Sequence, residues 1–196
     1  MLKLALALAL LLAVPSGPVS AQPLVSIDTH DAFFESLRAL CGQAFEGKVV
    51  EGNASDDDFA RQRLVMHVRE CGEHVLRIPF HVGDNRSRTW ILTRTGSGLQ
   101  LKHDHREPDG RDDDMTMYGG HTVDAGWASV QAFPADQYSK GLFVAHGIPQ
   151  SIDNTWHMYV YPDRFTYRLT RAGREFRVDF DLTRPVPSPP APWGAQ

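Results

Sequence analysis

Two histidines separated by one residue, His103 and His105, form the pattern in this sequence that most directly suggests chemistry. Residues i and i+2 of a β-strand lie on the same face, so the two imidazoles could bind one metal ion or contact one ligand. Leu99 and Leu101 fall in the same alternation. This phase predicts that both histidines point inward with the leucines, near one end of a strand over residues 99–105.

Three interpretations of the pair are open from the sequence. His103 and His105 could be hydrogen-bonded inside the core, could contact a bound ligand, or could bind a metal ion, and a buried imidazole needs partners in each case. A metal site requires a further ligand, which His121 or the acidic run 112–114 could supply. His81 has the outward phase of its own strand and is therefore expected on a solvated surface.

Aromatic and methionine side chains on several expected strands could line a ligand pocket. Trp156 and Tyr167 lie on two late strands, and Met115 and Met117 lie on the strand expected to pair with 99–105. An apolar pocket with a few polar groups is the usual form of a small-molecule site, although the same side chains could fill a core.

Motifs of common enzymes and cofactor sites are absent from the sequence. There is no P-loop and no G-x-G-x-x-G, and Ser97 lies in an expected hairpin turn instead of a strand-to-helix elbow. The acidic runs 56–58 and 109–114 lack the spacing of an EF-hand loop. No cofactor is indicated, and a binding protein is favoured over an enzyme.

The first 21 residues have the pattern of a secretory signal peptide. Lys3 precedes the apolar run Leu4–Val14, and Val19, Ser20 and Ala21 form a small-residue cleavage site. A membrane span needs about 20 apolar residues, and this run is shorter. No cysteine follows closely enough to carry a lipid, so we expect cleavage after Ala21, no stable membrane anchor, and a periplasmic or extracellular location.

The two cysteines and the net charge narrow the class of protein further. An isolated pair, Cys41 and Cys71, in an exported chain predicts a disulfide, since no C-x-x-C motif is present. The net charge of −4 gives no reason to expect a nucleic acid partner. No pattern in the sequence specifies an oligomeric state.

Alternating apolar and polar residues predict a domain built mainly of strands. The clearest example is 174–182, where Phe176, Val178 and Phe180 alternate with charged residues. Similar segments give about ten short strands, with a helix over 29–41 and a second helix inserted after Pro134. We expect one domain over 22–184 and an extended, poorly ordered proline-rich tail over 185–196.

Sequential hairpins favour an all-β antiparallel up-and-down barrel of eight to ten strands, because closure hides the strand edges; a two-sheet β-sandwich is the alternative. The layout resembles the calycin type, which includes lipocalins and fatty-acid-binding proteins. Phe45–Lys48 follows a short helix, and Arg174–Thr183 resembles a last strand. Segments 78–84 and 101–106 also resemble bacterial secreted proteins of unassigned function.

Two functions are compatible with these patterns. The favoured hypothesis is a periplasmic or extracellular binding protein that holds a small, largely apolar molecule inside the barrel. The alternative is a metal-binding protein or metal-dependent enzyme that uses His103 and His105.

Overall fold

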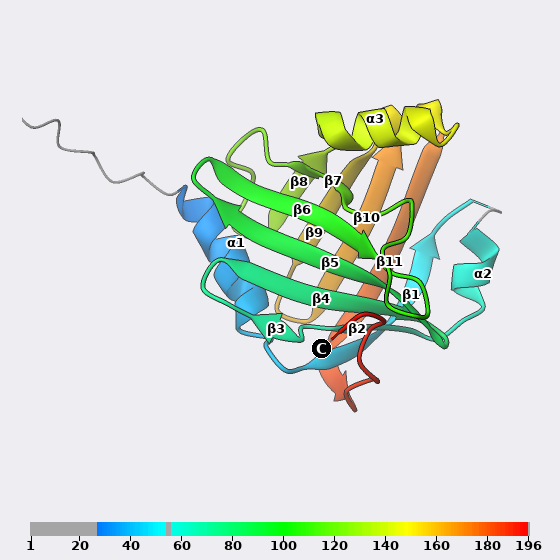
Figure 1. Cartoon of the computed structure of the whole chain (residues 1–196). Helices are drawn as coiled ribbons and strands as arrows, with labels where there is room; N and C mark the ends of the chain where they lie inside the picture. The colour runs from blue at the N-terminus through cyan, green and yellow to red at the C-terminus, as the bar shows by residue number, and fades with distance from the viewer. Residues whose placement is uncertain (1–26, 54–55, 196) are drawn as a thin grey trace, which may run out of the picture.

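The main feature of the computed structural model is one antiparallel sheet of eleven strands that curls into a nearly closed barrel (Figure 1). The structure describes residues 27–53 and 56–195, so the expected signal peptide over 1–21 lies outside the described residues. The strands are β1 (Ala44–Glu51), β2 (Leu64–His67), β3 (Glu70–Cys71), β4 (Val75–Val82), β5 (Asn85–Thr95), β6 (Gly98–His105), β7 (Tyr118–His121), β8 (Val130–Pro134), β9 (Thr155–Val160), β10 (Arg164–Arg171) and β11 (Arg174–Val186).

Strands that follow one another in the chain are also neighbours in the barrel. The order is β7-β6-β5-β4-β2-β1-β11-β10-β9-β8, with β3 paired to β4 at the side. The first and last strands, β1 and β11, pair antiparallel and join the two halves of this series. The expected up-and-down barrel is confirmed, with one more strand than expected, and the two-sheet sandwich does not form.

The barrel closes between β7 and β8 through a short contact instead of a long ladder. Gly120 forms a bridge with Ala135, and the N–H of Asp136 donates to the carbonyl of Gly119. A Cβ on Gly120 would lie 2.0 Å from the Pro134 carbonyl oxygen, so only glycine permits this approach. β7 starts only at Tyr118, so Met115 and Met117 precede the strand on which the sequence places them.

One end of the barrel is closed by α1 (Asp28–Arg38), and α2 (Asp57–Ala60) borders the opposite end (Figure 1). Phe33, Phe34 and Leu37 of α1 are fully buried in the core. The helix begins one residue before the predicted start, without a side-chain cap. The Thr29 hydroxyl donates to the Ala125 carbonyl.

The helix inserted late in the chain is confirmed as α3 (Gln137–Ala145), followed by the 3-10 helix η2 (Pro149–Asp153). The Asp136 carboxylate accepts from the Ser139 N–H and caps α3. Ser139 is fully buried and its hydroxyl accepts from the Gly119 N–H. The helix therefore supports β7 at the place where the barrel closes.

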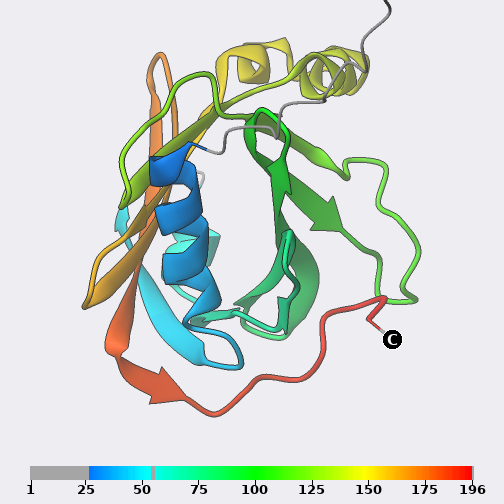
Figure 2. The same ribbon diagram turned by 90° about the vertical axis from the view of Figure 1, so that its left-hand side faces the viewer.

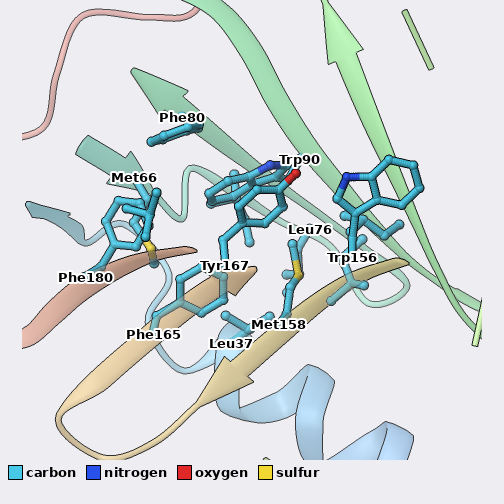
Figure 3. Packing of buried hydrophobic residues seen from close by; sticks show 14 of the residues in the cluster. Leu37, Met66, Leu76, Phe80, Trp90, Trp156, Met158, Phe165, Tyr167 and Phe180 are labelled. Atoms are coloured by element: carbon cyan, nitrogen blue, oxygen red, sulfur yellow. The ribbon is translucent and has the colours of Figure 1, made fainter. Parts of the chain in front are cut away.

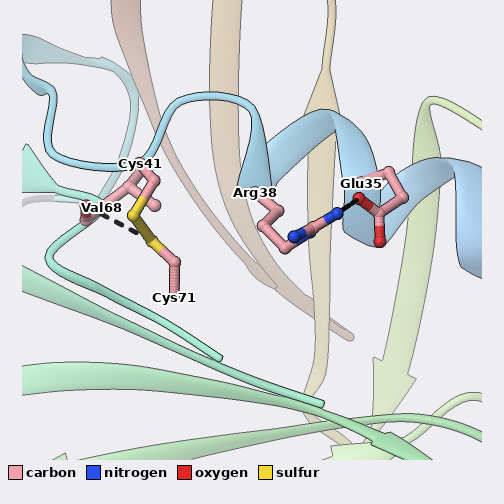
Figure 4. The surroundings of a disulfide bond; sticks show 5 residues. All are labelled: Glu35, Arg38, Cys41, Val68 and Cys71. Atoms are coloured by element: carbon pink, nitrogen blue, oxygen red, sulfur yellow. Dashed lines mark hydrogen bonds and ion pairs between the residues drawn. A yellow bond between two sulfur atoms is a disulfide. The ribbon is translucent and has the colours of Figure 1, made fainter. Parts of the chain in front are cut away.

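The predicted disulfide is confirmed and joins the segment after α1 to β3 (Figure 4). The Cα atoms of Cys41 and Cys71 lie 6.1 Å apart, within the usual range for a disulfide. Because 30 positions separate the two cysteines, the bond restricts the unfolded chain substantially. It fixes the closed end of the barrel to the helix that fills it.

The C-terminal segment extends the last strand and then contacts the outside of the barrel. The last strand continues to Val186, two residues past the expected domain boundary at 184. Residues 187–195 then run along the outside of the barrel towards the loop after β6 (Figure 2). The Trp193 N–H donates to the Arg86 carbonyl, and the Arg86 side chain donates to the Ala191 carbonyl. These bonds place the proline-rich segment against β5.

Candidate functional site

The barrel contains a cavity of about 330 Å³ at the end that α2 borders. Its walls come from strands β4, β5, β6, β7, β9, β10 and β11, and from α2, α3 and η2. The lining is dominated by eight aromatic side chains: Phe59, Phe80, Trp90, Tyr118, Phe143, Trp156, Tyr167 and Phe176. The volume lies at the lower end of the range for small-molecule sites, which restricts any occupant to a compact molecule.

A layer of stacked rings forms the floor of the cavity. The rings of Trp90 and Tyr167 have centroids 4.6 Å apart and are nearly parallel, which Figure 3 shows from close by. Phe80 stacks on the other side of Trp90 at 4.9 Å. Met158 and Phe165 are fully buried in the core that fills the rest of the barrel. The interior is therefore divided into a packed part towards α1 and a cavity at the end that α2 borders.

His103 points inward, as its phase predicts, and both of its ring nitrogens have partners. Its Nδ1 lies 3.1 Å from the Tyr118 carbonyl oxygen, which can only accept, so Nδ1 carries the proton. Burial lowers the pKa of His103 to about 3, so the ring is neutral and Nε2 is an acceptor. The Tyr167 hydroxyl, 2.8 Å away, donates to Nε2. His103 is thus a buried histidine that orients Tyr167 in the cavity floor.

His105 lies nearer the opening of the cavity than His103. Its Nε2 is 3.1 Å from the hydroxyl of Tyr118, whose ring stacks on that of His103. Burial, followed by the nearby charge of Arg88, lowers the pKa of His105 to about 4. Burial also raises the pKa of Tyr118 to about 12. Both groups are neutral near pH 7, so this wall offers hydrogen bonds without charge.

The structure does not bring the predicted metal ligands together. His121 is paired with Gln100, three residues along β6 from His103, and its Nε2 is bonded to the Thr95 hydroxyl. Both ring nitrogens of His103 are already used. Within the described ranges, no group of three histidine, cysteine or acidic side chains is placed to hold a metal ion. The expected site of His103, His105 and His121 is therefore corrected.

The four other residues proposed for ligand contact separate into two groups. Met115, Trp156 and Tyr167 line the cavity together with both histidines. Met117 does not line it and is partly exposed. Met117 has a φ of +57°, so the backbone turns there and the alternation that relates it to Met115 is lost.

Three arginines that the sequence analysis did not select also line the cavity. Arg88, Arg171 and Arg174 stand at the opening, and Asp56 forms a bidentate ion pair with Arg174. A recognisable signal was present in the sequence. Each arginine has the inward phase of its strand, since Arg88 precedes Trp90 by two residues and Arg171 follows Leu169 by two.

His81 departs from its expected position on a solvated surface. Its side chain has the outward phase but is only 4% exposed. The groove that contains His81 is also lined by residues 187–190 of the tail, which cross this face. Burial lowers the pKa of His81 to about 4, and its Nε2 has no hydrogen-bond partner among the described residues.

Comparisons of the chain with protein-family models, with curated proteins and with solved structures find no match. In the part of the chain that the structure describes, the helices are all too short or too polar to span a membrane.

Proposed function

We propose that this protein binds a small, largely apolar molecule in the cavity at the open end of its barrel. The observation that carries the proposal is the lining of eight aromatic side chains around a cavity of about 330 Å³. Such a surface stabilises an apolar ligand by roughly 25 cal/mol per Å² removed from water. Neutral His105 and Tyr118 supply hydrogen bonds that fix the orientation of the ligand.

The arrangement of His103 supports binding rather than metal chemistry. Its ring nitrogens are occupied by the Tyr118 carbonyl and the Tyr167 hydroxyl, which keeps Tyr167 in the floor. When the floor is already rigid, its side chains lose less conformational entropy as the ligand binds. His103 then acts as a positioning residue for the cavity and not as a ligand of a metal ion.

We also propose that the protein works outside the cytoplasm. The Cys41–Cys71 disulfide supports an oxidising compartment, and the pattern of residues 1–21 is typical of an export signal. The intact mass of the protein recovered from separated cell fractions tests this. Protein that starts at Gln22 and is found only outside the cytoplasm is expected, and full-length protein in the cytoplasm would contradict the proposal.

Ligand binding is tested by tryptophan fluorescence with naphthalene probes, since Trp90 and Trp156 line the cavity. Both 2-naphthamide, which is neutral, and 2-naphthoate should quench the emission saturably and compete with one another. The variant Leu169→Trp fills the cavity from β10 and should weaken binding of every probe by roughly tenfold or more.

The control variant is Val50→Trp, which adds the same bulk at a side chain exposed on β1. It should bind both probes as the wild type does. Native mass spectrometry of freshly purified protein is the second measurement. If no probe binds and no organic ligand is retained, the proposed function is wrong.

A further inference from the structure

On each of three strands, the residues that face the interior form a series that ends in an arginine. The three arginines lie at the same end of the barrel. On β5 the series is Leu92, Trp90, Arg88, and on β11 it is Val178, Phe176, Arg174. On β10 it continues through Leu169 to Arg171. All three arginines line the cavity, so the apolar walls give way to guanidinium groups at the opening.

Of these three guanidinium groups, one forms an ion pair with a carboxylate among the described residues. Arg174 is paired with the buried carboxylate of Asp56. Arg88 donates to neutral oxygens, the Asn85 side-chain oxygen at 3.1 Å and the Ser87 hydroxyl at 3.3 Å. Arg171 donates to the side-chain oxygen of Asn154 at 3.0 Å. Among residues 27–53 and 56–195, no carboxylate oxygen lies within 4.0 Å of the Arg88 or Arg171 guanidinium nitrogens.

The charge of the opening is therefore opposite to that of the chain. Its charged lining residues are three arginines and one aspartate, whereas the whole sequence has a net charge of −4. His105 and Tyr118, which face Arg88, are neutral near pH 7. The charge of Asp113 also acts on Arg88, but its carboxylate lies beyond the 4.0 Å of an ion pair. A concave apolar site with unpaired cations attracts anions more strongly than an open surface does.

Arg88 is the arginine best placed to recognise a bound anion. It is paired across the strands with His105 and is half-buried, directly above the ring of Trp90 in the series along β5. The Phe59 ring lies 5.2 Å from its guanidinium carbon and restricts its motion. A guanidinium group fixed in this way can donate two parallel hydrogen bonds to a carboxylate.

The apolar part of the lining indicates the shape of the ligand body. Eight aromatic rings line the cavity against three aliphatic or thioether side chains, Met115, Ile148 and Leu169. The floor is the nearly parallel stack of Trp90 and Tyr167. Aromatic walls favour ligands with flat rings. Stacked or edge-to-face contacts then add binding free energy beyond that of the apolar area buried.

From these observations we infer that the ligand is a compact aromatic carboxylate, with its ring between the aromatic walls and its carboxylate on Arg88. The inference rests on the proposed function and specifies the chemical class of molecule that the same cavity holds. Arg171, on β10, adds positive charge to the opening and attracts the anion as it enters.

The experiment compares 2-naphthoate with its neutral analogue 2-naphthamide in the wild type and in Arg88→Met. The wild type should bind the acid roughly tenfold or more tightly than the amide, because a charge-assisted hydrogen bond is stronger than a neutral one. In Arg88→Met the affinity for the acid should fall by roughly tenfold or more, and the affinity for the amide should fall much less, because the amide can lose only a hydrogen bond to a neutral acceptor. Arg184→Met, which removes an arginine whose side chain is 84% exposed, is the control and should bind as the wild type.

Each result has a distinct meaning. Equal affinity of the wild type for acid and amide overturns the inference and leaves the proposed function standing, whereas no binding of either probe overturns both. Tighter binding of decanoate than of 2-naphthoate overturns the assignment of a flat body. If Arg88→Met does not fold, Arg88→Lys and added NaCl replace it. Both should weaken binding of the acid more than binding of the amide, and equal effects on the two probes overturn the inference.

Discussion

The tautomer of His103 shows how single contacts define the chemistry of this barrel. The sequence predicts its inward direction from Leu99 and Leu101, and the structure places it there with 4% exposure. Its partner Tyr167 is 64 positions away, and no local pattern relates the two residues. The alternation of a strand gives the face of a side chain, but its partner across a barrel depends on how the strands pair and tilt.

Tyr167→Phe should destabilise the protein, because Nε2 of His103 would lose its only donor while remaining buried. The expected loss in the free energy of unfolding is about 1–3 kcal/mol, measured by urea denaturation at pH 7. Tyr161→Phe is the matched control on the outer, more exposed side of the barrel and should change stability by less than about 0.5 kcal/mol. Equal effects of the two variants would show that the hydroxyl of Tyr167 has no special role.

His81→Leu should make the stability of the protein less dependent on pH. The folded-state pKa of His81 is about 4, below the ordinary value of 6.5, so the contribution of neutral His81 is fully present above pH 6.5 and is lost as the pH falls towards 4. Between pH 7 and pH 5 the wild type should therefore lose about 1–2 kcal/mol more than the variant. Urea denaturation at both pH values measures this, and parallel losses would contradict it.

At the scale of elements, the alternation of residues predicts the strands well and their connections poorly. The pattern of β11 is confirmed from Phe176 to Phe180, all on the inner face. Between β6 and β7, the alternation of a strand would place Met115 and Met117 on the same face. The positive φ of Met117 interrupts this alternation, so the two side chains separate. Gly119 and Gly120 lie inside β7, and Gly120 lies at the contact that closes the barrel.

Gly120→Ala should weaken the closure between β7 and β8. The added Cβ would lie 2.0 Å from the Pro134 carbonyl oxygen, so the two strands must separate. We expect a loss of about 1–3 kcal/mol and faster hydrogen exchange in both strands. Gly141→Ala in α3 is the control, since no atom lies within 4 Å of its added Cβ, and it should raise stability by roughly 0.5–1 kcal/mol. Unchanged exchange in β7 and β8 would contradict the assigned role of Gly120.

At the scale of the whole molecule, sequential hairpins were enough to predict the barrel. They do not predict the cavity, because its volume depends on which rings stack as a floor. The group of Arg88, Arg171 and Arg174 arises only when the ends of three strands meet at one opening. Each arginine carried an inward phase in the sequence, but their common position follows from the closure of the sheet by β1 and β11.

The C-terminal tail connects distant parts of the molecule, because it runs from the end of the last strand to the loop after β6. Trp193 shares a groove with Thr89 and Asp104, which are buried although they face outward. A Cβ on Gly110 would lie 3.1 Å from the Cα of Gly194, so the tail contacts the loop that leads to Met115 in the cavity wall.

Trp193→Ala should release this segment and lower the free energy of unfolding by about 1–3 kcal/mol, because a half-buried indole loses its contacts on the groove. Hydrogen exchange of the loop 106–112 should rise as well, since the tail no longer holds it. Trp127→Ala is the matched control: it removes the same side chain where 74% of the residue is exposed, and it should leave both measurements unchanged. Equal stabilities of the two variants would show that the tail contributes nothing to the folded barrel.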